Sequence, residues 1–277
     1  MSSPHPLTAY LRTLIHAKQS PLCVSADVTT ASAMLSLAAA VGPSIAVFKT
    51  HADMHAGWDP DPERGTGAQL AALARRHRFL VFEDRKFADI GFTVQAQYAG
   101  GDHRIVEWAH VVNAHAVAGE DVLRALEGVA AEWVERNGSG GEPGDGRALL
   151  VVAQMSSANN LLDSRYTRAC VDMARRRRAF VMGFIAMEPL NEMPDDDFVV
   201  MTPGCALPRE ESLDGSEWAG GDALGQRYVS PQELMRRGCD LVIVGTGICN
   251  AQDPAAKAEQ YRKAAWDVYE ERLTSGK

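Results

Sequence analysis

The sequence predicts an α/β fold of the (β/α)8 TIM-barrel class, with residues 1–277 forming a single domain. Eight short apolar runs alternate with segments of mostly helical character. A length of 277 residues and a hydrophobic content of 46% are typical of one such barrel with a sizeable core. Polar residues from distant parts of the chain directly follow the apolar runs, as expected where a barrel carries its chemistry at the C-terminal ends of its strands.

The apolar runs and the helical periodicity place the elements in order along the chain. Strands are expected at residues 22–25, 45–48, 79–82, 110–112, 149–153, 180–185, 198–201 and 241–244. Helices are expected at residues 6–18, 30–41, 66–77, 120–135 and 165–178. Gly42 and Pro43 end the second of these helices. A glycine-rich composition predicts a flexible loop at about residues 137–147.

Charge and cysteine content narrow the class of protein. A net charge of -8 argues against sequence-independent binding of nucleic acid. The four arginines at 175–178 stand at a helix C-terminus, where cations complement the helix dipole, so we interpret them as a solvated face. The sequence contains no run of eighteen apolar residues, so it predicts no membrane span. Five cysteines without a CxxC pair or zinc spacing indicate reduced thiols in a cytoplasmic protein.

The stretch 79–91 combines a core strand with charge. Four apolar residues, 79–82, lead into Asp84, Lys86 and Asp89. Charge at the end of a buried strand is partly desolvated, and burying charge without pairing it is costly, so the arrangement suggests a functional use. The alternative is a solvated turn, because charged triples of this kind are common by chance.

Polar or small residues follow most of the predicted strands and would meet at one mouth of the barrel. They are Asp27, Lys49, Asp84, Lys86, Asn113, Ser156, Pro203 and Gly245. The loops after the seventh and eighth strands of such barrels commonly bind phosphate. Here they contain Thr202-Pro203-Gly204 and Gly245-Thr246-Gly247, whose small residues would expose backbone N–H groups to an anion.

These motifs together resemble the orotidine 5'-monophosphate decarboxylase family of the eukaryotic type. The resemblance rests on Phe82–Gly91, Phe48–His51, Met201–Gly204, Asp222–Tyr228 and Tyr261–Trp266, and extends over nearly the whole chain. It implies a (β/α)8 barrel without cofactor or metal that works as a homodimer. It also implies conversion of orotidine monophosphate to uridine monophosphate.

The resemblance further implies roles for individual residues. Lys49, Asp84, Lys86 and Asp89 of the partner subunit would form a charged tetrad, with Lys86 as the proton donor. The remaining positions would bind the substrate: Asp27, His51 and Thr93 at the ribose, Ser156 at the pyrimidine amide, Ile90 and Pro203 as apolar walls, and Gln226, Tyr228, Gly245 and Thr246 at the phosphate.

Several positions depart from the family pattern. Thr246 stands where the family has a phosphate-gripping arginine, Gln154 where we expect glutamate, and Phe92 where we expect asparagine. The loop at about 205–221 is longer than usual and acidic. Arg209 or Arg227 is a candidate replacement for the missing cation. A bidentate charge-assisted contact is worth on the order of 1.5–3 kcal/mol, so its loss bears on the substrate.

Three alternatives to an orotidine monophosphate decarboxylase remain open. A repurposed relative would use the same tetrad on another carboxylate, one without a phosphate. A non-catalytic binding protein would have little reason to keep all four tetrad residues. A metal-dependent epimerase or aldolase would use His51, His110, His115 and Asp84, although these histidines lack tight ligand spacing.

Overall fold

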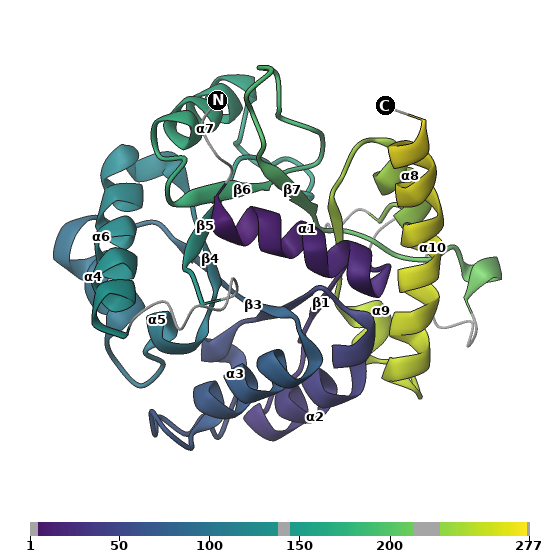
Figure 1. Ribbon diagram of the computed structural model, residues 1–277, viewed down its shortest axis with the longest axis horizontal. Coiled ribbons are helices and arrows are strands. Elements are labelled where there is room, and N and C mark those ends of the chain that lie inside the picture. Colours follow the sequence, from purple (N-terminus) through teal and green to yellow (C-terminus); the bar gives the residue numbers. More distant parts are fainter. Residues whose placement is uncertain (1–4, 138–144, 213–227, 276–277) are drawn as a thin grey trace.

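The computed structural model describes residues 5–137, 145–212 and 228–275. In chain order, eight parallel strands form a closed barrel, because β8 pairs back with β1 (Figure 1). The strands are β1 Leu22–Ser25, β2 Val47–Thr50, β3 Leu80–Phe87, β4 Val111–Ala114, β5 Ala148–Val152, β6 Val181–Ile185, β7 Val199–Thr202 and β8 Leu241–Val244. The barrel predicted from the sequence is confirmed.

Helices surround the ring of strands (Figure 1). They are α1 Pro6–Lys18, α2 Ala31–Val41, α3 Thr66–His77, α4 Gly91–Ala99, α5 Ile105–Trp108, α6 Glu120–Asn137, α7 Ser164–Arg176, α8 Pro231–Arg236, α9 Thr246–Cys249 and α10 Pro254–Thr274. Side-chain oxygens of Thr30, Asp163, Ser230 and Asp253 accept backbone N–H groups at the starts of α2, α7, α8 and α10. These caps satisfy N–H groups that have no partner within the helix.

The core lies inside the barrel and between the barrel and its helices. Strands such as β1, β5 and β8 are buried at every residue, as expected for parallel strands covered on both faces. Helix α1 runs across the ring of strands in Figure 1. Because it leads directly into β1, it closes the end at which the strands begin, and it buries Leu7, Leu11 and Leu14 there. The opposite end is left for the site.

The boundaries of several elements differ from the sequence prediction. Helices α1 and α3 agree to the residue, whereas β2 begins and ends two residues later than expected. Strand β3 continues through the charged residues to Phe87 instead of ending at Phe82, because β2 still pairs with it at Glu83 and β4 pairs with it as far as Phe87. The sequence analysis did not predict helices α4, α5, α8, α9 and α10.

Both loops expected from the sequence fall largely outside the described residues. These are 138–144 of the first loop and 213–221 of the second. The described start of the second loop contains a short 3-10 helix, Arg209–Glu211. In the ranges that the structure describes, we find no helix with the length and apolar character needed to cross a bilayer.

Candidate active site

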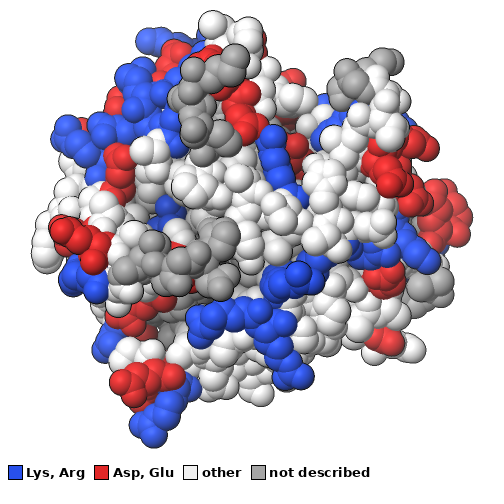
Figure 2. All heavy atoms as spheres, viewed as in Figure 1, with Lys and Arg blue, Asp and Glu red and all other residues white. Residues whose placement is uncertain are grey.

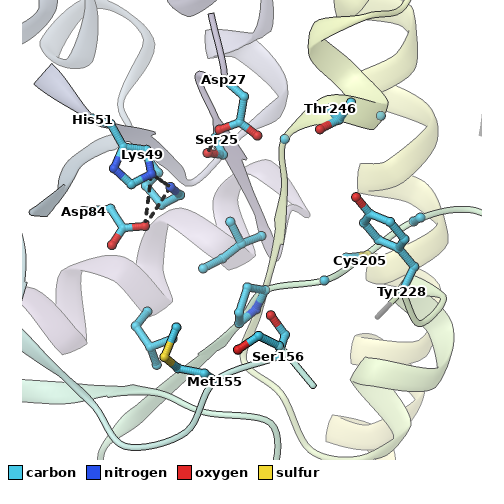
Figure 3. A pocket seen from close by; sticks show the side chains of 18 of the residues that line it. Ser25, Asp27, Lys49, His51, Asp84, Met155, Ser156, Cys205, Tyr228 and Thr246 are labelled. Atoms are coloured by element: carbon cyan, nitrogen blue, oxygen red, sulfur yellow. Dashed lines mark hydrogen bonds and ion pairs between the residues drawn. The ribbon is translucent and has the colours of Figure 1, made fainter. Parts of the chain in front are cut away.

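A cavity of about 780 Å³ opens at the C-terminal ends of the strands (Figure 3). Its volume lies in the range of about 300–1,000 Å³ found for small-molecule sites. It collects ten of the fourteen residues predicted to act in the site, which are Asp27, Lys49, His51, Asp84, Lys86, Ser156, Pro203, Tyr228, Gly245 and Thr246. Residues that are far apart in sequence therefore meet here because successive parallel strands end at the same mouth.

The strands themselves hold the central charged residues. Lys49 lies within β2, and Asp84 and Lys86 lie within β3, not in the loops that follow. Lys49 pairs in register with Phe82 of the neighbouring strand. The sequence analysis placed all three residues just beyond the strand ends. Because β2 ends later and β3 is longer than expected, these side chains are attached to the barrel wall, which is more rigid than a loop.

Lys49, Asp84 and Lys86 form an array of alternating charge. Lys49 Nζ donates to Asp84 Oδ2 at 2.8 Å, and Lys86 Nζ donates to Asp84 Oδ1 at 2.6 Å. Lys49 is buried, and the Asp84 side chain is only 11% exposed, whereas 36% of the Lys86 side chain is exposed. A buried carboxylate held between two ammonium groups is compensated for its lost hydration, and Lys86 presents the accessible charge.

The array keeps its inner members ionised. Burial alone would raise the pKa of Asp84, but Lys49 and Lys86 outweigh burial and hold that pKa far below its usual value. Burial likewise tends to lower the pKa of Lys49, and the nearby carboxylates of Asp84 and Asp27 raise it above the ordinary lysine value. Asp84 is therefore an anion and Lys49 a cation at neutral pH.

His51 completes the inner side of this array (Figure 3). Its Nε2 lies 2.8 Å from Lys49 Nζ and 3.4 Å from Asp84 Oδ2. Burial and the adjacent Lys49 ammonium lower the pKa of His51 to about 4. The imidazole is consequently neutral at pH 7. Its Nε2 accepts from Lys49, since an ammonium has no lone pair to offer.

Glu83 is a buried carboxyl that the sequence analysis did not single out. Its side chain accepts from Thr50 Oγ1 at 2.6 Å and from the Ala52 backbone N–H at 2.9 Å. Glu83 thereby ties β3 to the end of β2 on both sides of His51. Burial raises its pKa to about 8. The sequence feature that could have identified Glu83 is its position next to Asp84, at the end of an apolar run.

Replacing Glu83 with glutamine should change how stability depends on pH. The folded carboxyl, with its pKa near 8, keeps a proton that the unfolded chain releases near the ordinary glutamate value of 4.5. This contribution to stability is complete below about pH 4.5 and is lost as pH rises through about 8. Its slope approaches about 1.4 kcal/mol per pH unit at most.

Urea unfolding of both proteins at pH 5, 6.5 and 8 measures this effect. The free-energy difference between wild type and Glu83→Gln isolates Glu83, because other titrating groups are common to both proteins. We expect the wild type to lose stability relative to the variant across this range. Parallel curves would mean that Glu83 is ionised in the folded protein.

Asp27 lies between this array and the segment after β8, which forms the far side of the cavity (Figure 3). Ser25 Oγ donates to Asp27 Oδ1 at 2.5 Å. Asp27 Oδ2 lies so close to Gly245 that a Cβ at that position would collide with it. Glycine at 245 therefore permits the carboxylate and the backbone to approach. Thr246 and Asn250 line the cavity beside them.

This far side lacks a cation among the described residues. Figure 3 shows Thr246 and Tyr228 across the cavity from Lys49 and Asp84. Of the cavity-lining residues that the structure describes, Lys49 and Lys86 are the ones with cationic side chains. Arg209, a candidate for the missing cation, is not in the lining.

Two residues of the sequence prediction, one a phosphate contact and one a candidate cation, fall where the structure gives no description. Gln226 and Arg227 lie outside the described residues.

The loop after β5 supplies further lining residues. Gln154 Oε1 accepts from the Met187 backbone N–H at 2.8 Å, and its Nε2 donates to Glu188 at 2.8 Å. Glutamate at 154 would set two carboxylates against each other, so glutamine suits Glu188. Gln154 thus fixes the start of the loop that carries Met155 and Ser156 into the cavity (Figure 3).

Three predicted site residues do not line this cavity. Asp89 and Ile90 are exposed on the segment that joins β3 to α4, and Thr93 is exposed near the start of α4. Ile90 is 51% exposed, and neighbouring Phe92 is 83% exposed. The assignment of Asp89 to a partner's site remains a prediction, as do the roles of Ile90 and Thr93.

Two interpretations of charged groups can be compared with the structure. The arginines at 175–178 form ion pairs with Glu120, Glu127 and Asp196, as expected for a solvated face. His110 precedes β4 and its Nδ1 accepts the Val81 N–H, so it lies at the opposite end of the strand from the cavity. In the described part of the chain, no cluster of three or more metal-ligating side chains occurs.

The fold and site together define a (β/α)8 barrel with a buried lysine–aspartate array at the mouth where such barrels carry their chemistry. The sequence model of the orotidine 5'-phosphate decarboxylase / HUMPS family matches residues 20–261. The chain belongs to this family.

Relatives and solved structures agree with this assignment. Orotidine 5'-phosphate decarboxylase of Hypocrea jecorina is 41% identical, with 98% of this chain and 95% of the relative covered. That of Phycomyces blakesleeanus is 44% identical over 98% of this chain and 92% of the relative. Because these relatives are fungal, the chain is of the eukaryotic type.

Two archaeal structures share the fold of this chain. Orotidine 5'-monophosphate decarboxylase of Methanocaldococcus jannaschii, in complex with the inhibitor BMP, has a TM-score of 0.59 at 18% identity and covers 88% of this chain and 97% of that chain. The corresponding Pyrococcus horikoshii enzyme has the same TM-score and identity and covers 88% of this chain and 99% of that chain.

Proposed function

We propose that this protein decarboxylates orotidine 5'-monophosphate to uridine 5'-monophosphate without a cofactor. The observation that carries the proposal is the buried Lys49–Asp84–Lys86 array. It faces a cavity of suitable size in a chain whose relatives are named for this reaction. The natural partner is thus a nucleotide-like carboxylate, not nucleic acid or a membrane. The cysteine composition supports a cytoplasmic location.

Lys86 is the proton donor in this proposal. When the bond between C6 and the carboxylate breaks, the electron pair stays on C6 and CO2 leaves. The Lys86 ammonium, accessible from the cavity, stabilises the developing negative charge and then transfers a proton to C6. Solvent returns the proton to Lys86, so the enzyme ends the cycle unchanged.

Asp84 acts on the substrate carboxylate. Its low pKa keeps it ionised, so a bound carboxylate next to it is repelled. The repulsion is relieved in the transition state, because the substrate sheds that charge as CO2 forms. Lys49 holds Asp84 in place and balances its charge.

Asp89 joins the site from the partner subunit of a homodimer in this proposal. It lies on an exposed segment next to Ile90 and Phe92, which are 51% and 83% exposed. Neighbouring exposed apolar side chains favour a protein contact at this segment. Asp89 would complete the tetrad by pairing with Lys86 of the neighbouring chain.

The remaining predicted residues bind the rest of the nucleotide in this proposal. Asp27, His51 and Thr93 contact the ribose, Ser156 the pyrimidine amide, Ile90 and Pro203 the faces of the base, and Gln226, Tyr228, Gly245 and Thr246 the phosphate. The cavity lining supports seven of these assignments, since Ile90 and Thr93 are not among the described lining residues and Gln226 lies outside the described part of the chain.

A second candidate function is decarboxylation of a carboxylate without a phosphate. The absence of a cation beside Thr246, among the described lining residues, favours it. Among the described residues, a phosphate dianion there would find hydroxyl and backbone donors but no opposite charge. Both candidates use the same chemistry at Lys86, and they differ in the far end of the substrate.

Introducing a cation by Thr246→Arg should separate the two candidates. If the natural substrate carries a phosphate, a bidentate contact worth about 1.5–3 kcal/mol should raise kcat/KM for orotidine monophosphate by roughly 10–100-fold. Thr246→Gln is the matched control, because it adds length without charge. Steady-state kinetics with orotidine monophosphate and with orotidine measure the effect.

The two substrates then show what the site accepts. A gain for the nucleotide alone, confined to the arginine variant, means that the wild-type site accepts a phosphate that it holds weakly. Wild-type turnover of orotidine that exceeds turnover of the nucleotide would favour the second candidate. Equal effects of arginine and glutamine would contradict a role for charge at 246.

A further inference from the structure

A bulge interrupts β3 at the residues that carry the chemistry. Phe82 and Glu83 pair with Val111 and Val112 of β4, but the next pair is Phe87 with Ala114. Three residues, 84–86, therefore lie opposite the single residue Asn113. A bulge breaks the regular ladder of hydrogen bonds, so the backbone N–H groups within it need other acceptors.

The side chain of Asn113 bridges this bulge. Its Oδ1 accepts the backbone N–H of Lys86 at 2.7 Å, and its Nδ2 donates to Asp84 Oδ1 at 2.7 Å. The side chain is fully buried. The two contacts have opposite polarity, and they determine which end of the amide faces which partner.

Lys86 has a backbone conformation that needs such support. Its φ angle of 50° lies in the left-handed region, which is unfavourable for residues with a Cβ. The other described non-glycine residues with positive φ lie outside the strands, so Lys86 is alone in this respect within the described barrel wall. The bond from its N–H to Asn113 stabilises this conformation.

We propose that Asn113 is a positioning residue that fixes Lys86 and Asp84 relative to the substrate. Asp84 Oδ1 is shared between Lys86 Nζ at 2.6 Å and Asn113 Nδ2 at 2.7 Å. Asn113 therefore holds the carboxylate directly and the ammonium through the Lys86 backbone. It acts on the reaction through these two groups, and this role rests on the function proposed above.

Kinetics of two substitutions test the proposal. Asn113→Ala removes both contacts, and we expect kcat for orotidine monophosphate to fall about 10²-fold with little change in KM, as for a displacement of about 1 Å. Ser20→Ala is the matched control. It removes a buried hydroxyl that donates to the Ser44 carbonyl at 2.6 Å, at the end of the barrel where the strands begin, and it should leave kcat unchanged.

Asn113→Asp keeps the shape and the acceptor for the Lys86 N–H but sets a carboxyl against Asp84. Only the protonated acid can donate to Asp84, so kcat relative to wild type should rise as pH falls from 8 to 5. Asn113→Ala should show no such trend. Because Asn113→Asp is isosteric with the wild type, it still tests the proposal if the alanine variant does not fold.

Crystal structures of the variants give a readout that does not depend on turnover. In Asn113→Ala we expect Lys86 to leave the left-handed region and its ammonium to separate from Asp84. Unchanged geometry at Lys86, or a kcat loss matched by Ser20→Ala, would overturn the role of Asn113. A wild type without turnover would instead count against the proposed function, and the crystal structures would still decide the role of Asn113.

Discussion

Replacing Lys86 with alanine is expected to lower turnover of orotidine monophosphate by at least about 10⁴-fold. The substitution removes the proton donor, worth about 10²–10⁴-fold, and a positive charge beside the developing carbanion, worth about 10²–10³-fold. The fold should survive, because Asp84 keeps Lys49 and Asn113 as partners. The rate is measured from the fall in ultraviolet absorbance as orotidine monophosphate is consumed.

Lys263→Ala provides the control for removing a lysine. Lys263 is exposed on α10, away from the cavity lining, and its replacement should leave the rate unchanged. Circular dichroism verifies that both variants are folded. Retention of more than about one-hundredth of the wild-type rate by Lys86→Ala would exclude Lys86 as the proton donor, since most of the catalysis would then proceed without it.

Mixing two inactive variants is expected to restore activity if Asp89 serves the neighbouring site. Lys86→Ala and Asp89→Ala each damage both sites of their own homodimer. In a hybrid dimer both lesions fall in one site and leave the other intact. Random exchange makes half of the dimers hybrid, so about a quarter of wild-type activity should return.

The matched control mixes Lys86→Ala with Asp84→Ala. These two residues contact each other within one chain, with 2.6 Å between Lys86 Nζ and Asp84 Oδ1. Every site of the hybrid therefore lacks one of them, and no activity should return. Co-expression with two affinity tags isolates the hybrids. Failure of Lys86→Ala and Asp89→Ala to complement would place Asp89 outside the neighbouring site.

Strand order and the location of the site were predictable from apolar runs and the residues after them. Each run marks a strand buried on both faces, and parallel strands must end together. Asp27, Lys49 and Asp84 consequently meet as expected. The resemblance to a known family added roles that spacing alone does not give.

The geometry around Lys86 was not predictable in the same way. The left-handed backbone at Lys86 and the bulge in β3 arise from pairing between distant strands. Their supports, Glu83 and Asn113, make contacts 27 to 33 residues away in sequence. No periodicity encodes such contacts. Helix α10 also went unassigned, because its buried face includes Lys257, which interrupts the apolar pattern.

The most direct measurement follows wild-type protein and orotidine monophosphate by proton NMR in D2O. If Lys86 delivers a solvent-exchangeable proton to C6, the substrate should convert to uridine monophosphate that carries deuterium at C6. Substrate recovered unchanged, while circular dichroism shows a folded protein, would contradict the proposed function. The lysine–aspartate array would then serve a different carboxylate.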